Sequence, residues 1–241
     1  MAKHSIIRIP KGALLYDPDI LPPISADDFD PDRLASDRRL LGTMNGRAPV
    51  YVAKIGGQDV VLRHYRRGGI LARVRKDGYL WTGLKRTRPF REWWLLRRLR
   101  DRGLPVPAPA AARVLRGGPL YRADIMTVRL PNMRTMADRL REAPLPPAEW
   151  RLLGITLRRF HLAGACHADL NAMNILMSDQ AGPFLIDWDK GRLRSPQRAW
   201  QQRNLQRLRR SLDKLKAEHG VFHMDDAGWR MLLAGYDEGG G

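Results

Sequence analysis

The sequence has little cysteine and no long apolar segment. Its single cysteine, Cys166, has no second cysteine to pair with in this chain, which favours a reducing compartment such as the cytosol. No run of about 18 apolar residues occurs, so we expect no membrane-spanning helix. The N-terminal MAKHSIIRIPKG has too few apolar residues in a row for a signal peptide. These absences predict a protein of the cytosol or of a membrane face that borders it.

Acidic residues are also scarce relative to basic ones. The 241 residues include 43 Lys and Arg but 25 Asp and Glu, for a net charge of +18. Two blocks concentrate this excess: Arg63 to Arg102 has 14 basic and 3 acidic residues, and Lys190 to Lys216 has 10 basic and 1 acidic. Such blocks favour an anionic partner, which the charge alone leaves open among nucleic acid, anionic lipid and a phosphorylated substrate. A solvated basic surface without a partner is the alternative.

Internal repeats are absent, and the chain changes character along its length. With 44% hydrophobic residues it has enough apolar material for a packed core. Strand-like segments and one helix come first, and mostly helical segments around a small hairpin follow. This order predicts an α+β fold with two lobes. We expect an irregular lead-in over residues 1–40, an N-terminal nucleotide-binding lobe over 41–130 and a C-terminal catalytic lobe over 131–241.

Particular patterns place the elements of this fold. Apolar runs on both sides of the Gly56-Gly57 turn predict a β-hairpin, and helical spacing of apolar residues predicts a helix that Gly103 and Pro105 end. The same criteria predict strands at 50–55, 60–65, 124–129, 174–177 and 184–186, and helices at 90–102, 148–162, from 197 onward and around 226–236.

The segment HADLNAMNIL carries the most specific chemical signal. Asp169 lies in the loop after a predicted helix, Asn174 begins the first strand of a hairpin, and Asp187 follows the second strand. An antiparallel hairpin brings its open end together, so Asn174 and Asp187 are expected to be neighbours, with Asp169 beside them. Carboxylate and amide oxygens of this kind suit Mg²⁺, which usually takes one or two protein carboxylates, and a second, unliganded carboxylate can accept a proton from an attacking hydroxyl. Polar caps on a hairpin are the alternative explanation.

The pattern H-x-D-L-x-x-x-N, followed further along by two apolar residues and Asp, resembles the protein-kinase superfamily. The resemblance implies Asp169 as the catalytic residue and Asn174 and Asp187 as Mg²⁺ ligands, with ATP as co-substrate. It also implies that Leu130, before Pro131, belongs to the hinge that receives adenine.

Upstream, the resemblance includes departures from the superfamily pattern. Arg63 stands where the superfamily has a lysine on its third strand, and Glu92 stands where the helix glutamate that holds this lysine is expected. Lys54 is the alternative base, but it precedes the Gly-Gly turn and lies on the other strand of the hairpin. The glycine-rich phosphate loop is missing, and Gly42 and Gly46 are the glycines that mark a loop over the phosphates.

More narrowly, the segments LRHYRRGG, HADLNAxNIL and LIDWDKGR resemble the bacterial 3-deoxy-D-manno-octulosonic acid (Kdo) kinases of the lipopolysaccharide kinase family. This resemblance covers about 42–193. It implies ATP-dependent phosphorylation of a Kdo 4-hydroxyl on a lipid A precursor, by a peripheral protein on the cytoplasmic face of the inner membrane. The implied partners are ATP, an anionic Kdo-lipid A type glycolipid and an anionic membrane surface.

Two further functions compete with this one. A kinase-like enzyme can act on another acceptor, such as the tRNA-modification machinery or an aminoglycoside, and a catalytically idle basic module can bind nucleic acid. The joint presence of Asp169, Asn174 and Asp187 argues against an idle module, so nucleic acid is not the expected partner. The oligomeric state does not follow from the sequence.

Overall fold

The computed structural model describes residues 3–44, 49–66, 78–178 and 180–239. The chain divides into two compact units. The first consists of Met1–Arg97 and Ala108–Arg129, and the second of Arg98–Pro107 and Leu130–Gly241. The lobe boundaries near residues 41 and 131 stay predictions.

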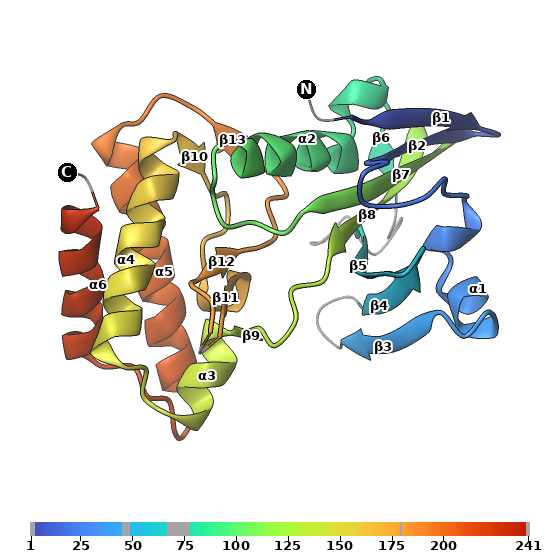
Figure 1. Cartoon of the computed structure of the whole chain (residues 1–241). Coiled ribbons are helices and arrows are strands. Elements are labelled where there is room, and N and C mark those ends of the chain that lie inside the picture. The colour runs from blue at the N-terminus through green and yellow to red at the C-terminus, as the bar shows by residue number, and fades with distance from the viewer. Residues whose placement is uncertain (1–2, 45–48, 67–77, 179, 240–241) are drawn as a thin grey trace. The chain divides into compact units, whose positions relative to one another are not determined.

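The first unit is built on an antiparallel sheet (Figure 1). The strand order among the described residues is β1-β2-β7-β8-β5-β4-β3, and β6 adds to β8. The strands are β1 (Ser5–Ile9), β2 (Gly12–Tyr16), β3 (Leu40–Met44), β4 (Val50–Ile55), β5 (Gln58–His64), β6 (Tyr79–Leu80), β7 (Pro109–Gly117) and β8 (Leu120–Val128).

The predicted hairpin is the β4–β5 pair. Ile55 lies opposite Gln58, and Gly56 and Gly57 between them have φ angles of 53° and 85°. Such left-handed angles are easy for glycine because it lacks a Cβ atom. Val60 and Leu62 of β5 point into the core and are buried, as the alternation of the sequence requires. Both predicted strands of this hairpin are therefore confirmed.

The expectation of an irregular lead-in over residues 1–40 is wrong. This segment holds the β1–β2 hairpin, a short 3-10 turn (Asp27–Phe29) and helix α1 (Pro31–Ser36). Strand β2 pairs with β1 on one edge and with β7 on the other, and its side chains from Ala13 to Tyr16 are buried. The strands were missed because proline and aspartate dominate the composition here. The run ALLY after Pro-Lys-Gly was the signal that could have shown them.

Helix α2 (Arg88–Asp101) follows a 3-10 turn (Leu84–Arg86) and corresponds to the helix predicted at 90–102. Phe90, Trp93, Leu96 and Leu99 are all buried and recur at intervals of three residues, which puts successive members of the series on the same side of the helix. Gly103, with a φ of 67°, ends the helix as predicted.

The second unit is mainly helical (Figure 1). Its helices are α3 (Met136–Glu142), α4 (Pro147–Leu162), α5 (Arg198–Glu218) and α6 (Asp226–Glu238). Its short strands are β9 (Arg134–Thr135), β10 (Ala165–Cys166), β11 (Ile175–Met177), β12 (Phe184–Leu185) and β13 (Arg192–Leu193), with a 3-10 turn at Ala172–Asn174. Strand β11 pairs with β12 and with β9, and β10 pairs with β13.

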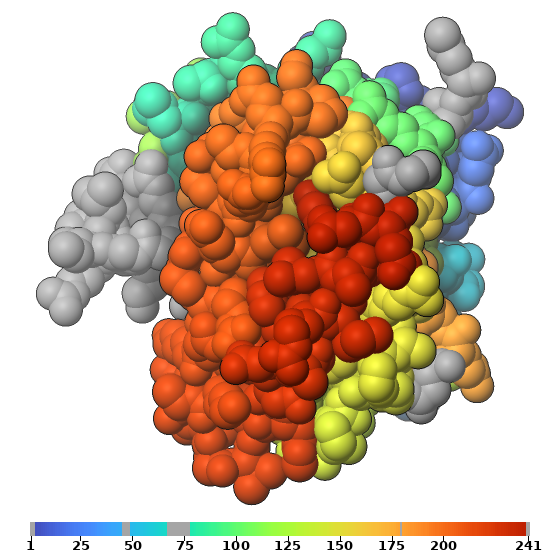
Figure 2. Space-filling model, turned by 90° about the vertical axis from the view of Figure 1, so that its left-hand side faces the viewer, coloured from blue at the N-terminus to red at the C-terminus, as the bar shows by residue number. Residues whose placement is uncertain are grey.

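Helix α5 corresponds to the helix predicted from residue 197 onward and carries a stripe of leucines. Leu205, Leu208 and Leu212 are buried on one face of the helix. In the space-filling view the red residues of α6 lie on the surface of this unit beside the orange-red residues of α5 (Figure 2). The buried stripe explains how an arginine-rich helix is stable here, because its apolar face packs against the unit while the charges face water.

Candidate active site

The loop after β10 is held by a neutral histidine. His167 is buried, its Nε2 donates to the Ile186 carbonyl at 2.9 Å, and its Nδ1 accepts the Asp169 N–H at 3.1 Å. A carbonyl accepts and an amide N–H donates, so these two bonds require the tautomer with its proton on Nε2. Burial lowers the pKa of His167, and this favours the neutral ring. His167 therefore has a structural hydrogen-bonding role in this loop.

Asparagine side chains bind the main chain of the same loop. The side-chain amides of Asn171 and Asn174 donate to the Asp169 carbonyl at 3.0 and 2.9 Å. Asn171 Oδ1 also accepts the N–H groups of Met173 and Asn174 and so caps the 3-10 turn that follows. The loop from His167 to Asn174, called the HAD loop below, is thus bonded internally, and the side chain of Asp169 is exposed.

The β11–β12 hairpin brings Asn174 and Asp187 to one end, as predicted. Ile175 pairs with Leu185, and the Ile186 N–H donates to the Asn174 carbonyl at 3.0 Å. Asp187 has a φ of 59°, a left-handed conformation that costs energy for a residue other than glycine.

Trp188 anchors the segment that holds Asp187. Its ring is 1% exposed and stacks on Phe160, and its Nε1 donates to the Leu185 carbonyl at 3.0 Å. The edge of the same ring meets His167, with ring centroids 4.7 Å apart. The buried Trp188 therefore fixes the position of the neighbouring residue, Asp187.

The donor set at this end can be tested for a metal ion. No cluster of three or more His, Cys, Asp or Glu side chains that could hold a metal is found among the described residues. Mg²⁺ does not need one, because it takes one or two carboxylates and completes its shell with phosphate and water. The side-chain amide nitrogen of Asn174 donates to the Asp169 carbonyl, so Oδ1 is the side-chain atom of Asn174 that can bind a cation. The set of Asn174 and Asp187 is compatible with Mg²⁺ bound together with a nucleotide.

In the first unit, the pair expected at Arg63 and Glu92 forms. Nη2 of Arg63 lies 2.6 and 2.7 Å from the two carboxylate oxygens of Glu92, whose side chain is 3% exposed. The other candidate, Lys54, lies opposite Asp59 on the hairpin, at 3.6 Å, and is mostly exposed. The structure thus places the arginine, and not the lysine, on the helix glutamate.

Tyr65 completes this pair and was missed from the sequence. Its hydroxyl donates to Glu92, and its ring lies under the guanidinium groups of Arg63 and Arg88 at 4.9 and 5.4 Å. Burial, strengthened by the charge of Glu92, raises the pKa of Tyr65 well above its usual value. The Tyr65 hydroxyl therefore stays protonated and keeps its hydrogen bond to Glu92. Its place two residues after Arg63, on the same face of the chain, was the signal available.

Leu130 and Gly46 are the two other residues predicted to contact the nucleotide. Leu130 is half-buried and lies two residues beyond the end of β8, where the second unit begins. Gly46 lies outside the described residues. Their roles stay predictions.

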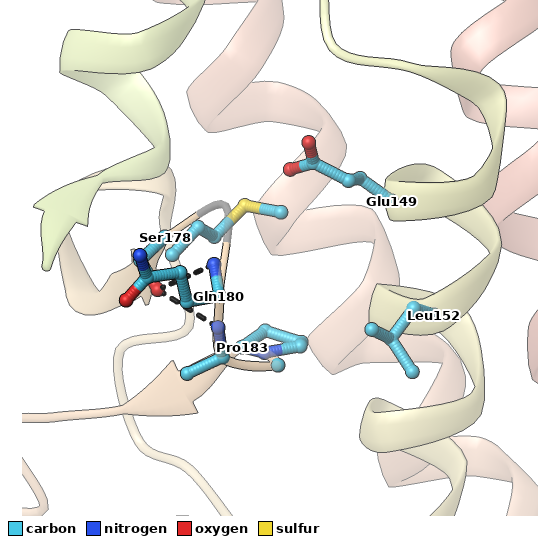
Figure 3. Close-up of a pocket in the computed structure, with 8 residues that line it drawn as sticks. Glu149, Leu152, Ser178, Gln180 and Pro183 are labelled. Atoms are coloured by element: carbon cyan, nitrogen blue, oxygen red, sulfur yellow. Dashed lines mark hydrogen bonds between the residues drawn. The ribbon is translucent and has the colours of Figure 1, made fainter.

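A shallow pocket in the second unit lies away from these residues. It encloses about 200 Å³ between α4 and the turn that joins β11 to β12 (Figure 3). Glu149 and Leu152 of α4 face Ser178 and Pro183, and Ser178 Oγ accepts the N–H groups of Gln180 and Ala181. The predicted catalytic and metal-binding residues do not line it.

Together, a β-rich unit with a base–glutamate pair and a helical unit with the HAD loop and an aspartate after a hairpin define the class of kinase-like phosphotransferases. Residues 32–236 match the model of the lipopolysaccharide kinase (Kdo/WaaP) family. The chain belongs to this family.

Three relatives agree with this membership. A 3-deoxy-D-manno-octulosonic acid kinase from Stenotrophomonas maltophilia (strain R551-3) is 45% identical over 87% of this chain and 84% of its own. Proteins of the same name from Xanthomonas campestris pv. campestris (strain B100) and Vibrio cholerae are 46% and 38% identical, over 85% and 80% of this chain and 82% and 81% of their own.

The structure of WaaP in complex with acyl carrier protein is similar with a TM-score of 0.54 and 18% identity, covering 85% of this chain and 81% of that chain. At this identity the likeness concerns the fold, and the predicted α+β kinase-like class is confirmed. Among the described residues, no helix has the length and apolar character needed to cross a bilayer.

Proposed function

We propose that this chain transfers the γ-phosphate of ATP to the 4-hydroxyl of a Kdo residue on a lipid A precursor, in lipopolysaccharide core biosynthesis. The observation that carries the proposal is the grouping of Asp169, Asn174 and Asp187 around one hairpin end, in a chain 45% identical to a Kdo kinase. The named relatives favour Kdo over tRNA machinery or an aminoglycoside as acceptor.

In this proposal Asp169 acts as the general base. Its exposed carboxylate accepts the proton of the acceptor hydroxyl while the hydroxyl oxygen attacks the γ-phosphorus. The bond from that phosphorus to the β,γ-bridging oxygen breaks, and ADP leaves. Asn174 and Asp187 would hold Mg²⁺, which neutralises charge on the phosphate oxygens. Arg63, held by Glu92 and Tyr65, is proposed to bind the α- and β-phosphates.

The acceptor implies a location. A lipid A precursor is embedded in the inner membrane, so we propose that the chain binds the cytoplasmic face of that membrane as a peripheral protein. Exposed arginines from the two basic blocks, such as Arg98 and Arg203, support contact with anionic headgroups.

The decisive test is transfer of labelled γ-phosphate from ATP to detergent-dispersed Kdo-lipid A in the presence of Mg²⁺. We expect label on the glycolipid, with its position at the 4-hydroxyl confirmed by NMR of the product, and transfer about a hundredfold slower or more by Asp169→Asn. Parallel reactions contain tRNA, an aminoglycoside and a generic protein. Label on one of these acceptors, with none on the glycolipid, would disprove the proposed acceptor.

A further inference from the structure

One face of helix α5 contacts the HAD loop at two points, at its first residue, His167, and near its end, at Ala172. The side-chain amide of Asn204, which is buried, donates to the His167 carbonyl at 3.0 Å. Two turns further along the helix, Ser211 Oγ accepts the Ala172 N–H at 3.3 Å. These two contacts hold the loop's main chain against the helix, so any side chain between them on this face lies over the loop.

Arg207 is the side chain between them. It lies three residues after Asn204 and four before Ser211, which puts all three on one helix face. Its Nη1 is 3.3 Å from Oδ1 of Asp169. The arginine therefore touches the very carboxylate proposed to bind the acceptor hydroxyl.

The Arg207–Asp169 pair has the features of a contact that a ligand can replace. The two side chains are 49% and 63% exposed, and one N–H group makes the contact at a long distance. Water competes well for such pairs, so they add little stability. A guanidinium has five N–H donors in a planar fork, so Arg207 can bind an anion of the acceptor in place of Asp169 and still lie next to that residue.

Arg209, two residues away, shows the contrast. Its Nε binds Asp213 and its Nη2 binds Asp226, both at 2.8 Å. Those two carboxylates raise the pKa of Arg209 and tie α5 to the start of α6. Arg209 therefore serves the fold, whereas the shape of the unit does not require Arg207.

We propose that Arg207 is a specificity-determining residue that binds a carboxylate of the acceptor beside the hydroxyl held by Asp169. This inference rests on the proposed function. In Kdo the carboxylate is attached to C2 and the reacting hydroxyl to C4, so one ring carbon separates their positions. Neighbouring groups on the substrate thus match neighbouring groups on the protein, and a carboxylate suits the bidentate geometry of a guanidinium. When Arg207 turns to the acceptor, Asp169 gains freedom to accept the hydroxyl proton.

The test combines an altered protein with an altered acceptor. Arg207→Gln and Arg207→Lys are compared with the wild-type chain on Kdo-lipid A and on the same acceptor with its Kdo carboxylate converted to an amide. Arg198→Gln is the matched control, because Arg198 is exposed and lies nine residues away, on the opposite face of α5. The acceptors are dispersed in detergent, and thermal unfolding checks that each variant is folded.

We expect Arg207→Gln to lower kcat/KM for the natural acceptor about tenfold or more, the value of a lost charge-assisted hydrogen bond. The KM for ATP should stay unchanged. With the amide acceptor, kcat/KM of the wild-type enzyme should fall by a similar factor, whereas kcat/KM of Arg207→Gln should fall little further. Arg207→Lys should be intermediate. Arg198→Gln should behave like wild type.

Other outcomes are distinct. If the amide lowers kcat/KM equally in the wild type and in Arg207→Gln, the arginine does not contact the carboxylate, and the inference fails while the proposed function survives. If the natural acceptor is not phosphorylated by the wild-type chain, the proposed function fails and takes this inference with it.

Discussion

At the scale of single residues, the carboxylates of Asp169 and Asp187 occupy different settings. Asp169 is exposed, and its carbonyl oxygen, not its carboxylate, accepts the asparagine side chains that order the loop. Asp187 is half-buried, strained at its backbone and supported by buried Trp188. An exposed carboxylate suits a group that meets successive acceptor molecules, and a supported one suits a ligand that must keep its position.

We therefore expect different effects when each carboxylate is replaced by its amide. Asp169→Asn should leave nucleotide affinity nearly unchanged and lower turnover about a hundredfold or more, because the proton acceptor is lost. Asp187→Asn should weaken binding of Mg²⁺ and ATP together. Nucleotide titrations at several Mg²⁺ concentrations, combined with single-turnover kinetics, measure both effects. Near-native turnover of Asp169→Asn would contradict its proposed role.

The buried partner of Arg63 makes this arginine important for stability as well as for binding. Arg63→Ala leaves the carboxylate of Glu92 buried at 3% exposure without its guanidinium, and we expect a loss of roughly 3 kcal/mol in the free energy of unfolding. ATP affinity should fall too. Lys54→Ala, at an exposed pair 3.6 Å long, should change either quantity little.

A double variant separates the two roles of Arg63. In Arg63→Met with Glu92→Gln no buried charge remains unpaired, so part of the stability should return while ATP affinity stays low. Chemical denaturation and nucleotide titration on the same samples provide the comparison. Recovery of ATP affinity in the double variant would show that Arg63 does not bind the phosphates.

His161 predicts how stability depends on pH. This residue of α4 is buried, and its ring contacts Trp200 of α5 and shares a hydrogen bond with the Tyr236 hydroxyl of α6. Burial lowers its pKa from 6.5 to about 4. Between these values the unfolded chain binds the proton and the folded chain does not, so stability falls as the pH falls from 6.5 toward 4.

For this single group the loss amounts to about 3 kcal/mol across the window. The free energy of unfolding, measured with denaturant at several pH values, should change less with pH in His161→Gln than in the wild type. His167, whose pKa is also lowered by burial, contributes to the pH dependence that remains. An identical pH dependence of stability in the two proteins would contradict this assignment.

At the scale of elements, two glycines set the distance between α4 and α6. A Cβ atom on Gly154 would lie 2.0 Å from the Leu232 carbonyl oxygen, and one on Gly235 would lie 2.1 Å from the Arg151 carbonyl oxygen. Because both obstacles are backbone atoms, they cannot move aside as a flexible side chain would. The helices in Figure 1 run close together for this reason.

We expect Gly154→Ala to destabilise the protein by about 1–3 kcal/mol, because the overlap outweighs the better helix propensity of alanine, about 1 kcal/mol. The matched control is Gly220→Ala, where nothing lies within 4 Å of the added methyl group. The thermal unfolding midpoints of the two variants give the comparison. Equal midpoints would show that the helices separate at little cost.

At the scale of the whole molecule, the structure divides the positive charge into two classes. Arg97 binds buried Asp17, Arg102 donates to the Ala163 carbonyl, and Arg209 bridges two carboxylates, so these residues serve the fold. Arg98 and Arg100 in the first basic block, and Arg203 and Arg210 in the second, are exposed. The exposed class is the one available to an anionic surface.

Binding to anionic vesicles should depend on the exposed class and on salt. Each basic side chain near such a surface contributes about 1 kcal/mol, and salt screens the attraction over about 10 Å. We expect Arg98→Gln with Arg100→Gln, and separately Arg203→Gln with Arg210→Gln, to weaken binding in vesicle sedimentation, and high salt to abolish it. ATP affinity should change less. Absence of vesicle binding at physiological salt would remove the membrane part of the proposal.

The sequence by itself determined the features that depend on neighbours along the chain. The Gly56-Gly57 hairpin, the end of α2 at Gly103 and the adjacency of Asn174 and Asp187 at a hairpin end follow from turn chemistry and from periods of two and 3.6 residues. The motif around Asp169 indicated the family for the same reason, since its spacing is local.

Tertiary structure alone decided what depends on segments far apart in the chain. Strand β2 finds its partner β7 about a hundred residues away, Tyr65 reaches Glu92 from another element, and the polar face of α5 closes over a loop some forty residues earlier. No local pattern encodes these pairings, because each arises when buried surfaces of separate elements meet and their polar groups must find partners. Arg207 reads as one more surface charge in the sequence, and only the packing of α5 brings it to Asp169.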